Sequence, residues 1–237
     1  MAEPPPPETV LTGGNMTPVV RVGDTVRRAS GPWTPTIHAL LRHVRAAGFG
    51  LGPQPLGIDD RGREILSFLP GLVPTYPLPA FVLSDDMLTT VGRTLRSYHD
   101  ATAGFDAPAG GAWQWPAREP AEVICHNDFA PYNLAFRDGL PVGAIDFEAA
   151  SPGPRAWDLA YLAYRLVPLA HPDNPDLPPR ADAAARFERL CAAYGDVEPC
   201  AVLALVPARL RELAATAPPA HAELYLADAA HIERRAG

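Results

Sequence analysis

The 237-residue sequence predicts an α+β protein with two lobes: a small antiparallel β-sheet lobe that includes one helix, and a larger, mainly helical lobe. Short runs rich in β-branched residues, separated by glycine-containing turns, occupy the first part of the chain. Apolar residues at helical spacing dominate the second half, and a stretch rich in proline separates the two patterns. We therefore expect a flexible proline-rich arm over residues 1–7, a first lobe over 8–70 and a second lobe over 71–237.

The first lobe is predicted to contain five short strands arranged around one helix. Gly13-Gly14-Asn15 and Gly23-Asp24 are typical turn sequences and separate the first three strands. A polar turn over residues 59–62 joins the last two strands. The expected strands cover residues 9–11, 19–22, 25–28, 55–58 and 64–68.

The helices are predicted from apolar spacing and from capping residues. Thr34 is expected to cap a helix whose first helical residue is Pro35 and which closes at Gly48. Ser84 is expected to cap the next helix, which carries a pair of aspartates in its first turn. Further helices are expected near residues 155–167, 181–194, 201–215 and 221–234.

The composition argues against several classes of function. The formal net charge of −7 leaves no basic stripe to neutralise the phosphates of a nucleic acid, whereas it is compatible with a cationic substrate. All 20 residues counted as Lys+Arg are arginines. Because it has no lysine, the chain cannot contain a Walker A phosphate loop or form a lysine Schiff base.

We expect a cytoplasmic protein without a membrane or nucleic-acid partner. No apolar run approaches the length that a bilayer requires, and the proline-rich start lacks the features of a signal peptide. Cys125, Cys191 and Cys200 follow no metal-binding or disulfide spacing, and an odd number of cysteines suits a reducing compartment. No feature of the sequence indicates an oligomeric state.

The most informative segments are residues 126–133, which read HNDFAPYN, and residues 145–148, which read IDFE. An apolar hairpin with an Asp138-Gly139 turn connects them, so Asn133 and Asp146 are expected to meet at its open end. An amide oxygen and a carboxylate oxygen are suitable ligands for Mg²⁺. Together these residues predict phosphoryl transfer, a reaction that needs a metal site and a carboxylate that orients the attacking hydroxyl.

Asp128 lies in the loop before this hairpin, within reach of a hydroxyl that approaches a bound phosphate. Simpler interpretations exist for each residue. Asp128 and Asn133 could cap turns, and His126 taken alone is more often a hydrogen-bonded structural histidine than a base. We favour phosphoryl transfer because the residues occur in order, at consistent spacing and around a plausible hairpin.

The chain resembles the aminoglycoside phosphotransferase and choline kinase family, whose fold is like that of protein kinases. The resemblance is carried by the His126-x-Asp128-(x)₄-Asn133 segment, by the segment around Asp146 and by Trp157-Asp158-Leu159-Ala160. The order of a small β lobe, a hinge and a helical lobe also agrees. The resemblance implies transfer of the γ-phosphate of ATP, with GTP not excluded, to a hydroxyl of a small molecule such as an aminoglycoside-like compound, an amino alcohol or a sugar.

The resemblance also implies roles for individual residues. Asp128 would be the catalytic residue, and Asn133 and Asp146 would ligate Mg²⁺. Glu148 would assist through water or a second metal, although a solvated turn carboxylate is an equal alternative. Asp158 would brace the catalytic loop, with His126 as a structural residue. Backbone groups around Ser67 to Leu69 would receive the adenine.

The sequence departs from the family pattern in its small lobe. The basic residue that contacts the ATP phosphates is expected to be Arg28, or Arg27 if the strand alternation is reversed. The helix over residues 34–47 contains no acid to pair with it, and its stripe of His38, Arg42 and Arg45 has no assigned role. Position 127 is Asn rather than the more usual Gly. A nucleotide-binding pseudokinase and a non-catalytic kinase-like binding protein therefore remain as alternatives.

Overall fold

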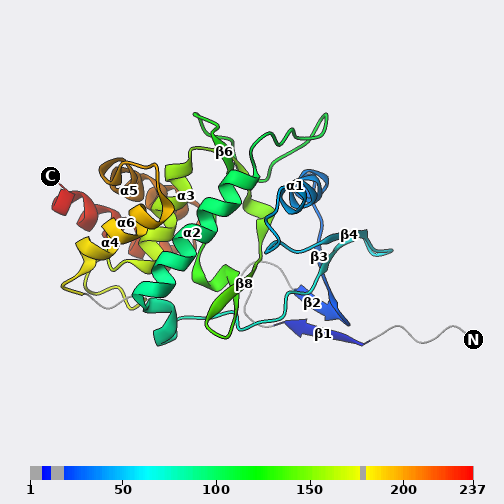
Figure 1. The fold of residues 1–237 in the computed structure, drawn as a ribbon, viewed down its shortest axis with the longest axis horizontal. Helices are drawn as coiled ribbons and strands as arrows, with labels where there is room; N and C mark the ends of the chain where they lie inside the picture. Colours follow the sequence, from blue (N-terminus) through cyan, green and yellow to red (C-terminus); the bar gives the residue numbers. More distant parts are fainter. Residues whose placement is uncertain (1–6, 12–18, 177–179, 237) are drawn as a thin grey trace, which may run out of the picture.

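The computed structural model describes residues 7–11, 19–176 and 180–236, and it has the two-lobed α+β architecture that the sequence predicts. The β-sheet and helix α1 of the small lobe lie to the right in Figure 1, and helices α4 to α6 of the large lobe lie to the left. The predicted arm, apart from Pro7, and the Gly13-Gly14-Asn15 turn lie outside the described residues.

The small lobe is built on one five-stranded antiparallel sheet with the strand order β1-β2-β3-β5-β4. The register of β3 against β5 places Arg28 directly opposite Glu64, so the two side chains share one face of the sheet. The strands are β1 (Glu8–Leu11), β2 (Val19–Val22), β3 (Thr25–Ala29), β4 (Pro55–Ile58) and β5 (Arg63–Ser67).

Helix α1 (Thr34–Ala46) packs beside this sheet through the apolar stripe seen in the sequence. Its N-cap is Trp33, so the prediction that Thr34 caps the helix is wrong. Thr34 lies inside the first turn, where its hydroxyl accepts a hydrogen bond from the Gly31 amide at 2.9 Å. Gly48 has a φ of +101° just beyond the helix, which is a conformation that glycine adopts without strain.

A proline-rich segment leads from the small lobe into helix α2 (Asp85–Ala101). Leu72 forms a two-way backbone bridge with Phe136, with both N–H···O distances at 2.8 Å. A short 3-10 helix (Ala80–Leu83) then precedes α2, and the Ser84 hydroxyl accepts from the Met87 amide at 3.2 Å. The predicted Ser84 cap is therefore confirmed.

Two small β ladders sit between the sheet and the helices of the large lobe. The predicted hairpin is present as β7 (Leu134–Arg137) and β8 (Leu140–Ala144), turned at Asp138-Gly139. A second ladder pairs β6 (Val123–Cys125) with β9 (Ser151–Gly153). The sequence analysis did not predict β9.

The large lobe is completed by four helices, and α3 forms its buried centre, with most of its side chains packed in the core. Within the described ranges, no single helix is long and apolar enough to cross a bilayer. The helices Ala183–Tyr194 and Pro199–Thr216 together have the length and composition of a span, but the pair is bent by 106°. The helices are α3 (Arg155–Leu166), α4 (Ala183–Tyr194), α5 (Pro199–Thr216) and α6 (Pro219–Ala236).

Candidate active site

The loop between β6 and β7 carries the first motif and is tied to the hairpin by its histidine. His126 is fully buried, and its Nδ1 accepts a hydrogen bond from the Asp128 amide at 3.3 Å. Its Nε2 lies 2.9 Å from the Ile145 carbonyl, so the ring proton resides on Nε2 and is donated there. The ring thereby connects the loop to the segment that precedes Asp146.

Asp128 projects from this loop with a hydrogen bond on each carboxylate oxygen. Its Oδ1 accepts from the Tyr132 hydroxyl at 2.6 Å, and its Oδ2 accepts from Asn133 Nδ2 at 2.8 Å. Burial raises the pKa of Asp128, whereas the hydrogen bond from Tyr132 opposes that rise. Two donors from opposite sides fix the plane of the carboxylate.

Asn133 and Asp146 lie at the open end of the β7–β8 hairpin. The residues Leu134 and Ala144 form the last paired positions there, and the Ile145 amide donates to the Asn133 carbonyl at 2.9 Å. Asp146 has a φ of +67°, an uncommon backbone conformation for a residue other than glycine. That conformation turns the chain immediately after the hairpin, where Glu148 follows in a short 3-10 helix.

Arg28 reaches from the small lobe to this point. Its Nη1 donates to Asp146 Oδ1 at 2.7 Å and lies 3.6 Å from Glu148 Oε2, and its Nε bonds Glu64. Burial alone would lower the pKa of Arg28, but the carboxylates of Glu64, Asp146 and Glu148 raise it above the ordinary value. Arg27 points elsewhere and bonds Thr25 Oγ1 at 2.6 Å, so Arg28 is the arginine that enters the site.

The acid that pairs with Arg28 is Glu64 of β5, and sequence reasoning missed it. Helix α1 carries no acid, and the register of β3 against β5 supplies one from the neighbouring strand. His38 of α1 is also buried, and its Nε2 lies 3.1 Å from Glu64 Oε2, which gives this residue of the unassigned stripe a place beside the site. Burial would raise the pKa of Glu64, but His38 and Arg28 lower it. Arg42 and Arg45 of the same stripe are exposed.

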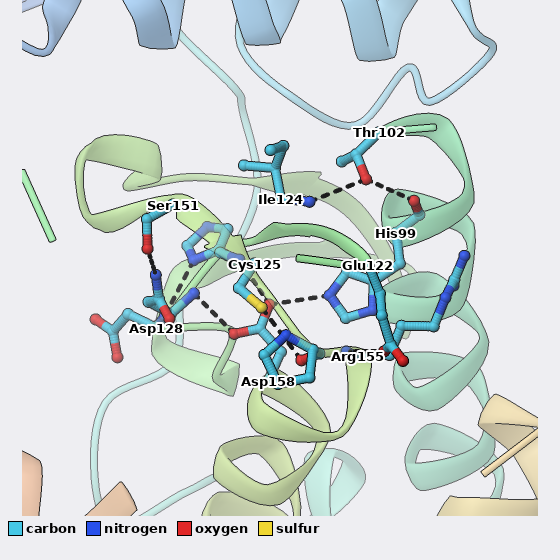
Figure 2. Close-up of polar contacts among 12 residues, drawn as sticks. His99, Thr102, Glu122, Ile124, Cys125, Asp128, Ser151, Arg155 and Asp158 are labelled. Atoms are coloured by element: carbon cyan, nitrogen blue, oxygen red, sulfur yellow. Dashed lines mark hydrogen bonds and ion pairs between the residues drawn. The ribbon is translucent and has the colours of Figure 1, made fainter. Parts of the chain in front are cut away.

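Asp158 accepts hydrogen bonds at the start of the loop that carries Asp128, and both residues are labelled in Figure 2. Its Oδ2 accepts from the His126 amide at 2.6 Å and from His99 Nε2 at 3.0 Å, and its Oδ1 accepts from the Asn127 amide at 2.8 Å. Asp158 is fully buried. Burial would raise its pKa, but the His99 hydrogen bond and the other donors lower it below the ordinary value.

Asn127 occupies the position where the family more usually has Gly, and its conformation explains the residue type. Its φ is +64°, and asparagine tolerates this left-handed region better than most residues other than glycine. Its Nδ2 donates to the Ala149 carbonyl and to Ser151 Oγ, both at 2.8 Å. The amide side chain thus stabilises the strained loop against the segment that follows Asp146.

Three further residues lie at or beneath the loop, and no local pattern in the sequence marks them. Arg209 of α5 donates to the Asn127 carbonyl, and Tyr194 of α4 lies 2.7 Å from His99 Nδ1. Cys125 lies close to His99 and Asp158, with potential ligand atoms within 4.8 Å of one another. The polar atoms of His99 and Asp158 are already hydrogen-bonded, so this buried group supports the loop.

The segment expected to receive the adenine follows β5. Ser67 pairs with Gln54, since its amide donates to the Gln54 carbonyl at 2.9 Å and its Oγ accepts from the Gln54 amide at 2.8 Å. No backbone hydrogen bond joins the Leu69 amide to another described residue. The Leu69 side chain packs directly against Gly143 of β8. A Cβ atom added to Gly143 would lie only 2.9 Å from Leu69 Cδ1.

Comparison with known proteins relates the chain to one protein family and to several proteins of known sequence or structure. The model of the "Phosphotransferase enzyme family" matches residues 105–200, which include the loop that carries Asp128, as well as Asp146 and Asp158. The predicted resemblance to this family is confirmed. A trifolitoxin immunity protein of Rhizobium leguminosarum bv. trifolii is 44% identical over 61% of this chain and 56% of its own. A homoserine kinase of Phenylobacterium zucineum (strain HLK1) is 29% identical over a match that covers 53% of this chain and 50% of the kinase. The chain thus spans about half the length of these two relatives.

Solved phosphotransferase structures share the fold across nearly the whole chain. A choline/ethanolamine kinase family protein from Mesorhizobium loti matches with a TM-score of 0.60 and 19% identity, covering 95% of this chain and 87% of its own. The macrolide 2′-phosphotransferase MphH from Brachybacterium faecium matches with a TM-score of 0.60 and 16% identity, covering 93% and 91%. At these identities the matches show the kinase-like fold.

Proposed function

We propose that this protein is a Mg²⁺- and ATP-dependent phosphotransferase that moves the γ-phosphate of ATP to a hydroxyl of a small molecule. The observation that carries the proposal is the connected set of Asp128, Asn133, Asp146 and Arg28. Asp128 bonds Asn133, Asn133 adjoins the segment of Asp146, and Asp146 bonds Arg28. These are the groups that phosphoryl transfer needs, because the protein mainly positions the reactants and offsets phosphate charge.

In this proposal Asp128 accepts a hydrogen bond from the acceptor hydroxyl and receives its proton as the phosphoryl group is transferred. A carboxylate offers about four lone-pair positions, and the Tyr132 and Asn133 donors use one on each oxygen. Each oxygen therefore keeps room for a substrate hydroxyl. The fixed orientation favours a geometry in which the hydroxyl oxygen faces the phosphate.

The residues fit a magnesium ion. Among the described residues, none donates a hydrogen bond to Asn133 Oδ1 or to Asp146 Oδ2, so each has an oxygen available for a metal. Three carboxylates, from Glu64, Asp146 and Glu148, surround the single guanidinium of Arg28, so the cluster suits an added cation. A bound Mg²⁺ would supply charge neutralisation of the β- and γ-phosphates.

Arg28 would contact the phosphates. Its Nη2 has no hydrogen bond to another described residue, whereas Nε and Nη1 are held by Glu64 and Asp146. A guanidinium fixed in this way presents its remaining donors toward an anion bound near Asp146. The Leu69 amide, which also lacks a backbone partner, would meet the adenine edge, with GTP as an alternative donor. A small lobe over residues 8–70 would thus hold the nucleotide, and residues 71–237 the catalytic loop and acceptor.

The names of the relatives guide the choice of acceptor. The relatives with solved structures include a choline/ethanolamine kinase family protein, a macrolide 2′-phosphotransferase and a streptomycin–ATP complex of APH(2″)-IIa. A homoserine kinase is among the relatives by sequence. We therefore propose a small alcohol, and we give amino alcohols and hydroxy amino acids a place beside aminoglycosides, sugars and macrolides. A cytoplasmic location remains part of this proposal.

The test is acceptor-stimulated ADP release from Mg²⁺–ATP across that panel, with Asp128→Asn measured in parallel. We expect one acceptor class to stimulate release, and the variant to lose about 100- to 10,000-fold in kcat because proton acceptance is removed. ATP binding, measured by calorimetry, should persist in the variant. Binding of ATP without stimulation by any acceptor would instead indicate a pseudokinase.

A second candidate function is protection against a toxin. It rests on the trifolitoxin immunity protein, which at 44% has a higher sequence identity than the homoserine kinase. In this version the acceptor hydroxyl belongs to a toxin. Expression of the chain in a toxin-sensitive strain, beside the Asp128→Asn variant, would test it. Protection that the variant loses would indicate phosphorylation, and protection that the variant keeps would indicate binding alone.

A further inference from the structure

A chain of hydrogen bonds links Asp128 to a buried arginine of helix α3. The Tyr132 hydroxyl lies 2.6 Å from Asp128 Oδ1 and 2.6 Å from the Tyr161 hydroxyl. Arg165 Nε lies 3.1 Å from the same Tyr161 oxygen. Two phenols therefore connect a guanidinium to the carboxylate on which the proposed reaction depends.

The direction of this chain follows from the number of protons available. An ionised carboxylate only accepts hydrogen bonds, so Tyr132 donates its single hydroxyl proton to Asp128. Tyr161 must then be the donor in the contact between the two hydroxyls, and its own oxygen accepts from Arg165 Nε. Every donor points toward Asp128. Hydrogen bonds aligned in one direction polarise one another and are stronger together than singly.

Arg165 is itself held firmly at the far end of the chain. Its side chain is 8% exposed, its Nη1 lies 3.0 Å from Asp176 Oδ2, and its Nη2 donates to the Tyr225 hydroxyl at 2.9 Å. Five tyrosine rings surround the guanidinium, with centroids 5.0 to 5.8 Å from Cζ; they belong to Tyr76, Tyr132, Tyr161, Tyr164 and Tyr225. Such contacts stabilise a buried cation, so the arginine is a fixed anchor.

We propose that Tyr132, Tyr161 and Arg165 are positioning residues that orient the Asp128 carboxylate toward the acceptor hydroxyl. The proposal rests on the function proposed above. Asn133 fixes Oδ2 from within the loop, and the phenol chain fixes Oδ1 from helix α3, so the carboxylate cannot rotate without losing both bonds. The orientation of the Asp128 carboxylate therefore depends on how helix α3 packs in the large lobe.

The main test compares Tyr132→Phe and Tyr161→Phe with Tyr225→Phe. The control removes a hydroxyl that contacts the same guanidinium through Nη2 and lies outside the hydrogen-bonded series from Arg165 Nε to Asp128. We expect Tyr132→Phe to lower kcat by about 10- to 100-fold, the range of a lost hydrogen bond to a charged group. Tyr161→Phe should lower kcat less, and Tyr225→Phe by less than about twofold. KM for ATP should stay within about twofold in all three variants.

A spectroscopic measurement tests the chain without turnover. Protons in short hydrogen bonds to a charged acceptor are strongly deshielded, so the Tyr132 hydroxyl should give a downfield proton resonance. We expect that resonance to disappear in Tyr132→Phe, to move upfield in Asp128→Asn, and to shift in Tyr161→Phe. It should be unchanged in Tyr225→Phe.

The outcomes separate this proposal from the proposed function. If the resonance behaves as expected but no acceptor is phosphorylated, the hydrogen bonds from Arg165 to Asp128 are present and the proposed function fails. If phosphorylation occurs but Tyr132→Phe and Tyr161→Phe match the control in kcat, the positioning role is wrong. A Tyr132 resonance that does not respond to Asp128→Asn or Tyr161→Phe would likewise refute the proposed series of hydrogen bonds.

Discussion

Removing the carboxylate of Asp158 should destabilise the protein more than any exposed substitution, because three buried donors depend on it. Asp158→Ala leaves the amides of His126 and Asn127 and the Nε2 proton of His99 without an acceptor. The carboxylate is fully buried, so water cannot replace it without opening the core.

The expected loss can be worked from these contacts. Each buried donor left unpaired costs about 1–3 kcal/mol, and breaking a buried charged pair typically costs about 3–5 kcal/mol. The three donors share one acceptor, so their costs are not additive, and we expect about 4 kcal/mol for Asp158→Ala. For a domain of this size that corresponds to a fall in Tm of roughly 8–16 °C. Asp158→Asn keeps one acceptor oxygen but turns an N–H toward a donor, and it should lose about 2 kcal/mol.

The assay is urea unfolding followed by tryptophan fluorescence and by far-UV circular dichroism. Coincidence of the two signals establishes that a two-state free energy of unfolding can be extracted. The control is Glu233→Gln, which breaks an exposed pair with Arg211 and should leave the midpoint unchanged. Losses below about 1 kcal/mol in both Asp158 variants would refute the reasoning, since they would mean that the three donors find other acceptors.

Two further predictions follow from the charged groups. The folded-state pKa of Asp158 lies below its ordinary value, so its stabilising contribution is complete above the unfolded-state pKa and is lost as pH falls through the folded-state value. The free energy of unfolding should therefore decline more steeply between pH 7 and 3 in the wild type than in Asp158→Asn, and parallel pH curves would contradict this. Arg28→Met should raise KM for ATP by about 10- to 100-fold through loss of a charged phosphate contact, with partial recovery in Arg28→Lys. Arg27→Met is the matched control, and equal effects of Arg27→Met and Arg28→Met on KM would contradict the assignment.

Local sequence patterns predicted most of the fold. The strands, the Asp138-Gly139 hairpin and the Ser84 cap depend on neighbours within a few residues, and the structure has all of them. The β9 strand (Ser151–Gly153) has no such signal, because serine, proline and glycine have low strand propensity. It forms through its pairing with β6, which only the tertiary fold provides. The Thr34 cap failed because the helix begins one residue earlier, with Trp33 as its cap.

The candidate site divides in the same way. The sequence predicts that Asp128, Asn133 and Asp146 lie near one another, because their spacing on one loop and one hairpin is visible in the chain, and the structure places them together. The acid beside Arg28 comes from the neighbouring strand β5 and not from helix α1. The strand register that brings Glu64 there cannot be read from the composition. Tyr132 stands within the motif, yet its link to Arg165 depends on how helix α3 packs.

The hydrogen bonds that hold the loop carrying Asp128 also bear on the order in which the molecule can assemble. Asp158 comes 31 to 32 residues after the amides that it binds, and Arg209 comes 82 residues after the carbonyl of Asn127. During synthesis, the loop must therefore leave the ribosome long before its supports exist. Until α5 docks, a strained segment with a left-handed Asn127 has no anchor on that side. The loop that carries Asp128 thus becomes fully supported only late in folding, after helix α5 has been made and has docked.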